Sequence, residues 1–233
     1  DSLGNDAGYA NYVHITRDER GFEVLYSYTD RFGFPQKNKD GAYMTRKDYD
    51  DMGNQIKEAS LNIVGDYMID DYGNCGWEST YNKKGRQTSA RYFDANWKPI
   101  RMPNLRGGSG NVYGFKYEKD EFGRDTTTII TDGNGNPDIN EFGVHKIKRV
   151  YNEHGRWTYF GYYDLAGNLH AGEKSGVAEA INEFDSNGNI LLIEYRNEKG
   201  QPVVNDNGYC KKSFAYDKKG VEISEIEFVV NNS

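Results

Sequence analysis

The sequence is poor in the residues that build a deep hydrophobic core or a membrane span. Only 36% of its 233 residues are hydrophobic, and it contains 2 cysteines, 3 tryptophans and 5 prolines. No apolar run is long enough for a spanning helix, so we expect no membrane insertion. The net charge is -7 and the basic residues are scattered. Because phosphate binding needs clustered Lys and Arg, this charge pattern argues against nucleic acid as a partner.

Patterns for metal ligands and for nucleophiles are also missing. The histidines His14, His145, His154 and His170 have no second His or Cys at metal-ligand spacing. The stretch at 107–111, GGSGN, lacks the last glycine of a G-x-S-x-G elbow. We therefore predict no cofactor and no catalytic machinery. A hydrolase with a pair of acidic residues stays open as the weakest alternative.

Glycine, in contrast, recurs with a fixed period along the whole chain. Asp or Asn stands three residues before each marker glycine, which gives the pattern D/N-x-x-G. In such a turn the Asp or Asn side chain accepts backbone N–H groups and glycine supplies a positive φ. Each copy therefore predicts a hairpin tip, and the period predicts a repeat protein. The markers are 32 or 33 residues apart, with one gap of 38: Gly21, Gly53, Gly85, Gly123, Gly155, Gly188 and Gly220.

Each unit contains a second tip and a third glycine. Asp or Asn recurs nine residues after the marker and glycine, in most copies, twelve after it. The eight residues between the tips alternate in polarity, and the odd positions, such as Val24, Tyr26 and Tyr28, predict a buried face. A third glycine about twenty residues after the marker is interpreted as a loop glycine. Prolines that follow the second tip favour a loop or an edge strand there.

These patterns together predict an all-β fold. We expect residues 1–233 to be a single tandem array of about seven 32-residue β-hairpin repeats, forming an extended or curved antiparallel sheet like that of a solenoid. An isolated hairpin is marginally stable, so each unit must pack against its neighbours. Cys75 and Cys210 share one repeat position, four units apart. We expect free, packed thiols, since a disulfide would require the array to close on itself.

The first departure from the repeat lies between the third and fourth units. The fourth unit begins six residues late, with a Gly-rich loop between Arg101 and its marker that also contains Arg106. Trp97 replaces a turn glycine nearby. An exposed loop beside Trp and Arg is a candidate recognition site, and a tolerated surface insertion is the alternative.

Two further candidates are a strand rich in aromatic residues and an acidic loop. Trp157, Tyr159 and Tyr163 could stack on sugar rings or cover a neighbouring unit. A weak calcium candidate has oxygen ligands at alternate positions, but a proline occupies the glycine position of an EF-hand loop and a glycine that of its last Glu. The turn pattern explains the same residues as a second tip. The calcium candidate comprises Asp132, Asn134, Asn136 and Asp138.

Several segments resemble a known repeat family. Residues 150–169, 183–203 and 215–228 contain the Y-D-x-x-G-[NR] core in forms such as AYDKKG and EFDSNG. They resemble the YD-type repeats of bacterial RHS and wall-associated proteins, although the 32-residue unit is longer than theirs. The phrase GYYDLAGNLHAG also resembles the aromatic hairpins of choline-binding and clostridial toxin repeats. The first resemblance implies a secreted or surface β-sheet array without catalytic residues, and the second implies binding of choline or glycans.

These observations favour a structural or protein-interaction module that a bacterium secretes or displays on its surface. The chain starts at Asp1 without a methionine, which we interpret as a fragment or a product whose signal peptide has been removed. A glycan-binding repeat protein is the alternative, so the expected partner is a protein or a cell-surface glycan.

Overall fold

The computed structural model describes residues 12–102, 111–172 and 174–229. All regular structure in these ranges is β-strand. The strands are β1 (Tyr12–Arg17), β2 (Glu23–Thr29), β3 (Met44–Tyr49), β4 (Gln55–Leu61), β5 (Gly76–Tyr81), β6 (Gln87–Phe93), β7 (Gly114–Lys119), β8 (Asp125–Thr131), β9 (Lys146–Tyr151), β10 (Trp157–Tyr163), β11 (Glu179–Phe184), β12 (Ile190–Arg196), β13 (Lys211–Tyr216) and β14 (Glu222–Phe228).

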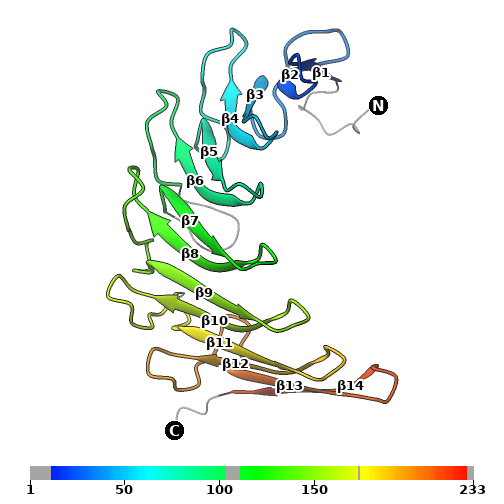
Figure 1. Cartoon of the computed structure of the whole chain (residues 1–233), viewed down its shortest axis with the longest axis vertical. Coiled ribbons are helices and arrows are strands. Elements are labelled where there is room, and N and C mark those ends of the chain that lie inside the picture. The colour runs from blue at the N-terminus through cyan, green and yellow to red at the C-terminus, as the bar shows by residue number, and fades with distance from the viewer. Residues whose placement is uncertain (1–11, 103–110, 173, 230–233) are drawn as a thin grey trace. The chain divides into compact units, whose positions relative to one another are not determined.

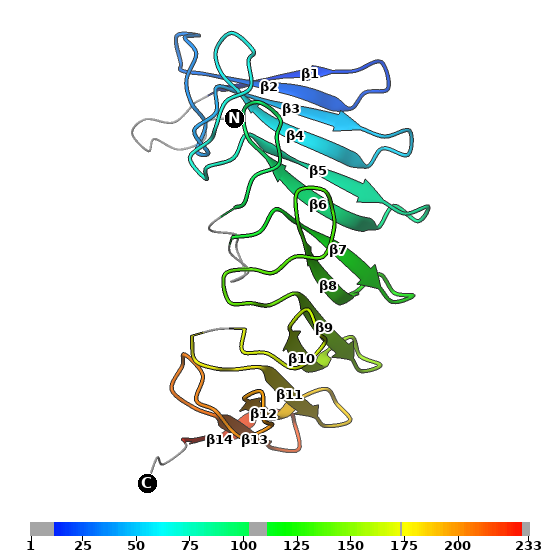
Figure 2. The same cartoon turned by 90° about the vertical axis from the view of Figure 1, so that its left-hand side faces the viewer.

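The strands take their places in the sheet in the order of the sequence, and successive strands form seven hairpins (Figure 1). The predicted all-β fold built of tandem hairpins is therefore confirmed. The chain divides into two compact units, Asp1–Phe115 with Gly133–Gly135, and Lys116–Asp132 with Asn136–Ser233. Within each unit the tight hairpin tips lie on one side and the longer connecting loops on the other (Figure 2).

The first tip of each unit has the turn that D/N-x-x-G predicts. In the β3–β4 hairpin, Asp50 Oδ1 accepts the N–H groups of Met52 at 3.0 Å and Asn54 at 2.8 Å. Gly53 donates its N–H to the Asp50 carbonyl at 3.1 Å and has a φ of 83°. Asp50 donates its N–H to the Asn54 carbonyl at 3.0 Å, so Gly53 and Asn54 together oppose Asp50, which is the bulge that such a turn requires. The pairing register shifts a second time between Asp48 and Tyr49. The side chain of Asn54 donates to Asp50 and lowers the pKa of that carboxyl group.

The third glycine also belongs to a turn of this kind, which corrects its interpretation as a simple loop glycine. Asn38 Oδ1 accepts the N–H groups of Asp40 at 3.0 Å and Ala42 at 2.9 Å, and Gly41 donates to the Asn38 carbonyl. A unit thus has three Asx turns instead of two. The glycine N–H bond of this third turn recurs at Asp70, Asn140 and Asn205.

The residue two positions after the third glycine adds one more rung to the sheet. Cys75, for example, donates its N–H to the Phe93 carbonyl at 2.7 Å and accepts the N–H of Ser60 at 2.7 Å. It thereby bridges the second strands of two consecutive hairpins. Cys210 occupies the same place between Tyr195 and Phe228. Both thiols are free and buried, and burial raises the pKa of the Cys75 thiol to about 11.

The core lies at this end of the hairpins, where the connecting loops join the strands. Buried side chains occur on both faces of the sheet there, because Ala59 and Leu61 occupy even positions of their strand whereas Ala90 occupies an odd one. The prediction of a single buried face on the odd positions is therefore wrong. Nearer the tips, Leu191 is at an odd position and exposed. Burial consequently follows position along the hairpin more closely than it follows the strand period.

Candidate functional site

Trp97, the residue that replaces a turn glycine, is held in an aromatic cluster. Its φ of 57° is left-handed, as the glycine position requires, and its N–H still donates to Asp94 at 3.0 Å. The indole stacks on Phe93 and on Tyr67, each at 4.9 Å between ring centroids. Trp97 is therefore a half-buried residue that packs against the rings of Phe93 and Tyr67.

Two charged groups complete this cluster. The indole Nε1–H donates to Glu78 Oε1 at 2.7 Å. The Lys57 ammonium lies 3.5 Å from the Trp97 ring centroid and donates to the Tyr67 hydroxyl at 3.0 Å. A cation over an indole face is a favourable contact of about 0.5–1 kcal/mol at an exposed site. The polar groups around Trp97 thus bind one another, and the arrangement stabilises the turn.

Arg101 contacts residues that follow the inserted loop. Arg101 donates Nη1 to the Asn111 carbonyl at 2.6 Å, and its guanidinium lies 5.0 Å from the Tyr113 ring centroid. Arg101 therefore ties the two ends of the inserted loop together. Arg106 lies outside the described residues.

A bulge between Trp157 and Tyr159 divides the aromatic side chains of β10 between two faces. Trp157 pairs with Tyr151 and its ring centroid lies 6.3 Å from that of Phe160, whereas Tyr159 pairs with Val150 and shares its face with Tyr163. Trp157 is 37% exposed. The hydroxyl groups of Tyr159 and Tyr163 form a hydrogen bond of 2.7 Å. Burial is the main cause, and this hydrogen bond the second, of a raised pKa of Tyr159. The Tyr159 hydroxyl group consequently stays protonated at neutral pH. The indole of Trp157 and the pair of tyrosine hydroxyl groups therefore lie on opposite faces of β10.

Neighbouring residues that the sequence did not single out shape the face of β10 that carries Tyr159 and Tyr163. Gly161 lies between the two tyrosines, and a Cβ there would be 2.4 Å from the Tyr159 hydroxyl oxygen, so the Tyr159 side chain covers the glycine. Gly161 pairs with Lys148 on one side and with Glu179 on the other. The Lys148 ammonium lies 5.0 Å from the Tyr163 ring centroid. Register, which the sequence does not reveal, brings this lysine to the tyrosine.

The acidic loop of the calcium candidate has the geometry of a second-tip turn. Asp132 Oδ1 accepts the N–H of Asn136 at 2.8 Å and its Oδ2 accepts the Asn136 amide at 3.1 Å. The Asp138 carbonyl accepts the ring Nδ1 of His145 at 2.8 Å. Of the residues that the structure describes, no three His, Cys, Asp or Glu side chains converge as ligands for a metal.

A cavity of about 410 Å³ lies in the first of the two compact units. Its lining combines aromatic and acidic side chains, among them Tyr72, Trp77, Asp40 and Asp70. Burial raises the pKa of Asp70. Carboxylates and aromatic rings can hold a hydroxyl-rich ligand. The repeat pattern of the sequence does not mark these residues.

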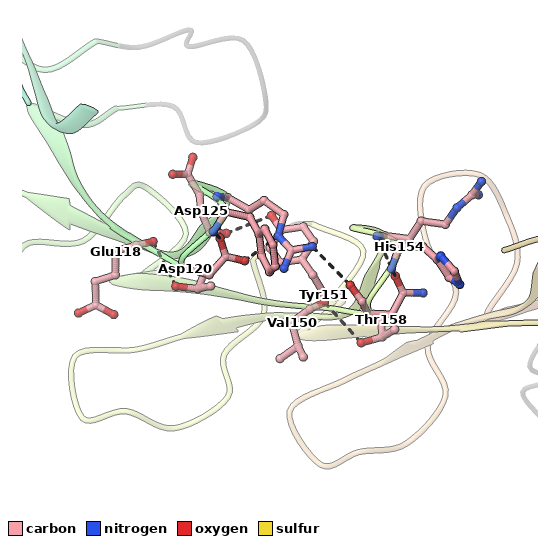
Figure 3. A network of polar contacts seen from close by, with 12 residues as sticks. Glu118, Asp120, Asp125, Val150, Tyr151, His154 and Thr158 are labelled. Carbon is pink, nitrogen blue, oxygen red and sulfur yellow. Dashed lines mark hydrogen bonds and ion pairs between the residues drawn. The ribbon is translucent and has the colours of Figure 1, made fainter. Parts of the chain in front are cut away.

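A contact between consecutive hairpins uses the aromatic residue that precedes the Asx turn (Figure 3). The Tyr151 hydroxyl donates to the carbonyl of Asp125, two residues after the previous marker, at 3.1 Å. In the first of the two compact units, the Tyr81 hydroxyl donates in the same way to the Gln55 carbonyl at 2.9 Å, and the Tyr49 hydroxyl to the Glu23 carbonyl at 3.2 Å. We call this bond the latch. It gives the recurring tyrosine a role that the sequence pattern left without one.

An arginine accompanies the latch at the hairpin tips. Arg124 follows its marker glycine, lies 4.8 Å from the Tyr151 ring centroid, and donates to the Asn152 carbonyl at 3.4 Å. Its Nε also binds Asp120 Oδ2 at 2.6 Å. Asn152 in turn accepts the N–H of His154, which is thus a turn residue as the sequence predicts (Figure 3).

The latch persists where the tyrosine hydroxyl is missing. Phe184 stands at the tyrosine position of β11 and has no hydroxyl group. Asn182, two residues earlier on the same strand, donates its side-chain amide to the Trp157 carbonyl at 3.2 Å. Trp157 is two residues after its marker, so the acceptor position is the same. The fold and these contacts define a tandem β-hairpin repeat protein.

Comparison with known proteins finds distant structural likenesses only. No family model matches the sequence, and no curated protein matches it. The crystal structure of TcdB2-TccC3-Cdc42 is 12% identical with a TM-score of 0.39, over 91% of this chain and 11% of that chain. The Photorhabdus luminescens Tc holotoxin pore is 10% identical with a TM-score of 0.39, over 94% of this chain and 12% of that one. Within the described residues, no helix has the length and apolarity needed to cross a membrane.

Proposed function

We propose that this chain is a non-catalytic structural or protein-interaction repeat module of a secreted or surface-displayed bacterial protein. One observation carries the proposal: the recurring residues of the repeat contact backbone atoms of the same turn or of the previous hairpin. Asp50 holds its own turn, and Tyr81 bonds the carbonyl of Gln55 in the hairpin before it. Residues used in this way serve the array itself, as the scaffold of a solenoid requires.

Stretching single molecules between their two ends tests the structural role. Each 32-residue unit extends by about 110 Å when its hairpin opens, so we expect force peaks separated by multiples of this length. Tyr81→Phe removes one latch bond and lowers the force of the peak that contains it. Tyr72→Phe is the matched control, because Tyr72 lies in the same unit and is exposed. Extension without peaks, or equal forces in the two variants, would contradict the proposal that the array resists mechanical force.

Binding of a glycan is the second candidate, favoured by the indole of Trp157, which is 37% exposed and is the kind of side chain that stacks on sugar rings. A glycan array is the direct assay. If β10 is the site, specific binding is lost in Trp157→Ala and kept in Thr158→Ala, which removes a small neighbouring side chain whose hydroxyl bonds the Val150 carbonyl. If the cavity of the first unit is the site, Tyr72→Ala loses binding instead. Binding to no glycan refutes this candidate and leaves the structural role standing.

A further inference from the structure

The first and last strands that the structure describes, β1 and β14, differ from all other described strands in exposure. Every residue of β1 and of β14 is exposed, and each strand has a single neighbour among the described strands. Apolar side chains are among those exposed, including Tyr12 and Ile226 at 52% each and Ile223 at 66%. An unpaired edge with apolar side chains is a template for pairing with another strand.

The register of the repeat says which strand would fit the edge of β14. In five contacts between consecutive hairpins, the residues four, five and six after one marker face those seven, eight and nine before the next. Leu192 facing Ser213 is one example. Five repetitions of one register, with different side chains in each, show that the hairpin geometry imposes it.

We propose that the free edge of β14 pairs with the free edge of β1 from a second copy of this chain, in the register of the internal contacts, so that copies join head to tail. The inference rests on the proposed role as a structural module. The register places Ile226 opposite Tyr12, Glu225 opposite Val13 and Ser224 opposite His14. An aromatic side chain opposite a β-branched one is a favourable cross-strand pair.

The two edges offer one complementary pair of charges, Glu222 and Arg17, because Glu225 and Glu227 already bind Lys212 of β13 at 2.6 Å and 3.1 Å. Residues 222–229, EISEIEFV, contain three glutamates and no basic residue, whereas residues 12–17, YVHITR, contain Arg17, His14 and no acidic residue. Arg17 stands at the latch position of the first hairpin, where four of the other hairpins have tyrosine. The same register brings its guanidinium to the carbonyl and carboxylate of Glu222. Arg17 now binds Glu23 Oε1 at 2.5 Å, on the surface, where such a pair contributes little.

Joining β14 to β1 uses two different surfaces, so the interface is heterologous and leaves a free edge at each end of the product. Association therefore gives open chains of copies whose length grows with concentration. Opposite charges at the interface also make the association weaker in high salt.

Sedimentation of the purified chain from 10 µM to 1 mM, conditions chosen to span a weak interface, measures this association. We expect the mean mass to rise with concentration and to fall on addition of salt. Ile226→Lys should weaken association about tenfold or more, because it places a charge on the edge. Val64→Lys is the matched control, an apolar side chain 74% exposed on a loop. A monomer at every concentration, or equal effects of the two variants, overturns the proposal.

Disulfide trapping between two variants tests the register. Protein with Tyr12→Cys is mixed with protein carrying Ile226→Cys, and directly opposed residues are close enough to bridge. Ile223→Cys is the control, since Ile223 is also exposed but lies on the other face of β14. The native Cys75 and Cys210 are buried. Faster trapping of the 12–226 pair supports the register, and equal rates overturn it. Force peaks that persist in a purely monomeric chain would refute the head-to-tail contact alone.

Discussion

Replacing Trp97 by glycine restores the residue that the repeat pattern places at this turn, yet we predict that it destabilises the protein. Residues that agree with a consensus commonly stabilise a fold. The left-handed backbone at Trp97, with its φ of 57°, also costs a non-glycine residue about 1 kcal/mol. Glycine would relieve that strain. The pattern alone therefore predicts a more stable variant.

The contacts of the indole oppose this gain and outweigh it. Two stacked ring pairs contribute about 0.5–1.5 kcal/mol each. The contact with Lys57 contributes about 0.5–1 kcal/mol. The bond to Glu78, which is partly solvated, contributes about 1 kcal/mol. After subtracting the relief of strain, Trp97→Gly should lower the free energy of unfolding by about 1.5–4 kcal/mol.

Urea unfolding followed by circular dichroism measures this difference. Gly65→Ala is the reference for the strain, because Gly65 holds the same turn position one unit earlier, has a φ of 91°, and has open space around its Cβ direction. That variant should lose about 1 kcal/mol from backbone strain alone. If Trp97→Gly is as stable as the wild type or more so, the aromatic cluster contributes less than the strain that it holds, and the reasoning fails.

Three further substitutions test the turns and the strand packing. Asp50→Asn removes a carboxylate whose pKa the Asn54 side chain lowers, so the wild type should lose stability relative to this variant as the pH falls below about 4. Asp70→Asn removes a carboxylate whose pKa burial raises, so the wild type should instead gain on this variant over the same fall in pH. Urea unfolding at pH 3 and pH 7 measures both differences in the free energy of unfolding. If the two differences change in the same direction as the pH falls, the opposite pKa shifts of Asp50 and Asp70 are contradicted. Gly76→Ala places a Cβ 2.0 Å from the Glu58 carbonyl oxygen and should lower the free energy of unfolding by about 1–3 kcal/mol, which an unchanged urea midpoint would refute.

The hairpin tips could be predicted from the sequence because their chemistry is local. Asp50 and Gly53 determine the turn within four residues, and both residue types have a conformational reason to be there. The third turn uses the same chemistry at Asn38 and Gly41, so the sequence contains the D/N-x-x-G signal for this turn as well. The face of the strand that is buried could not be predicted in this way, because the connecting loops determine burial at one end of the hairpin.

The latch could not be predicted, because its acceptor is a backbone carbonyl. Tyr81 and Gln55 are 26 residues apart, as are Tyr151 and Asp125. A carbonyl is present whatever side chain the residue has, so the acceptor position has no signature in the sequence. Only the donor recurs, as an aromatic residue before the turn. The pattern thus contained half of the contact.

The same chemistry explains how units can differ so much in sequence while they keep one geometry. An acceptor that is backbone does not restrict the side chain at its position, so Glu23, Gln55 and Asp125 all serve. The donor is also replaceable, since Asn182 reaches the Trp157 carbonyl where Phe184 cannot. Side chains on the outer surface are consequently free to vary from unit to unit. If a partner is recognised, we expect its specificity to lie in these variable side chains, and the turns and latches to set only the spacing at which they are presented.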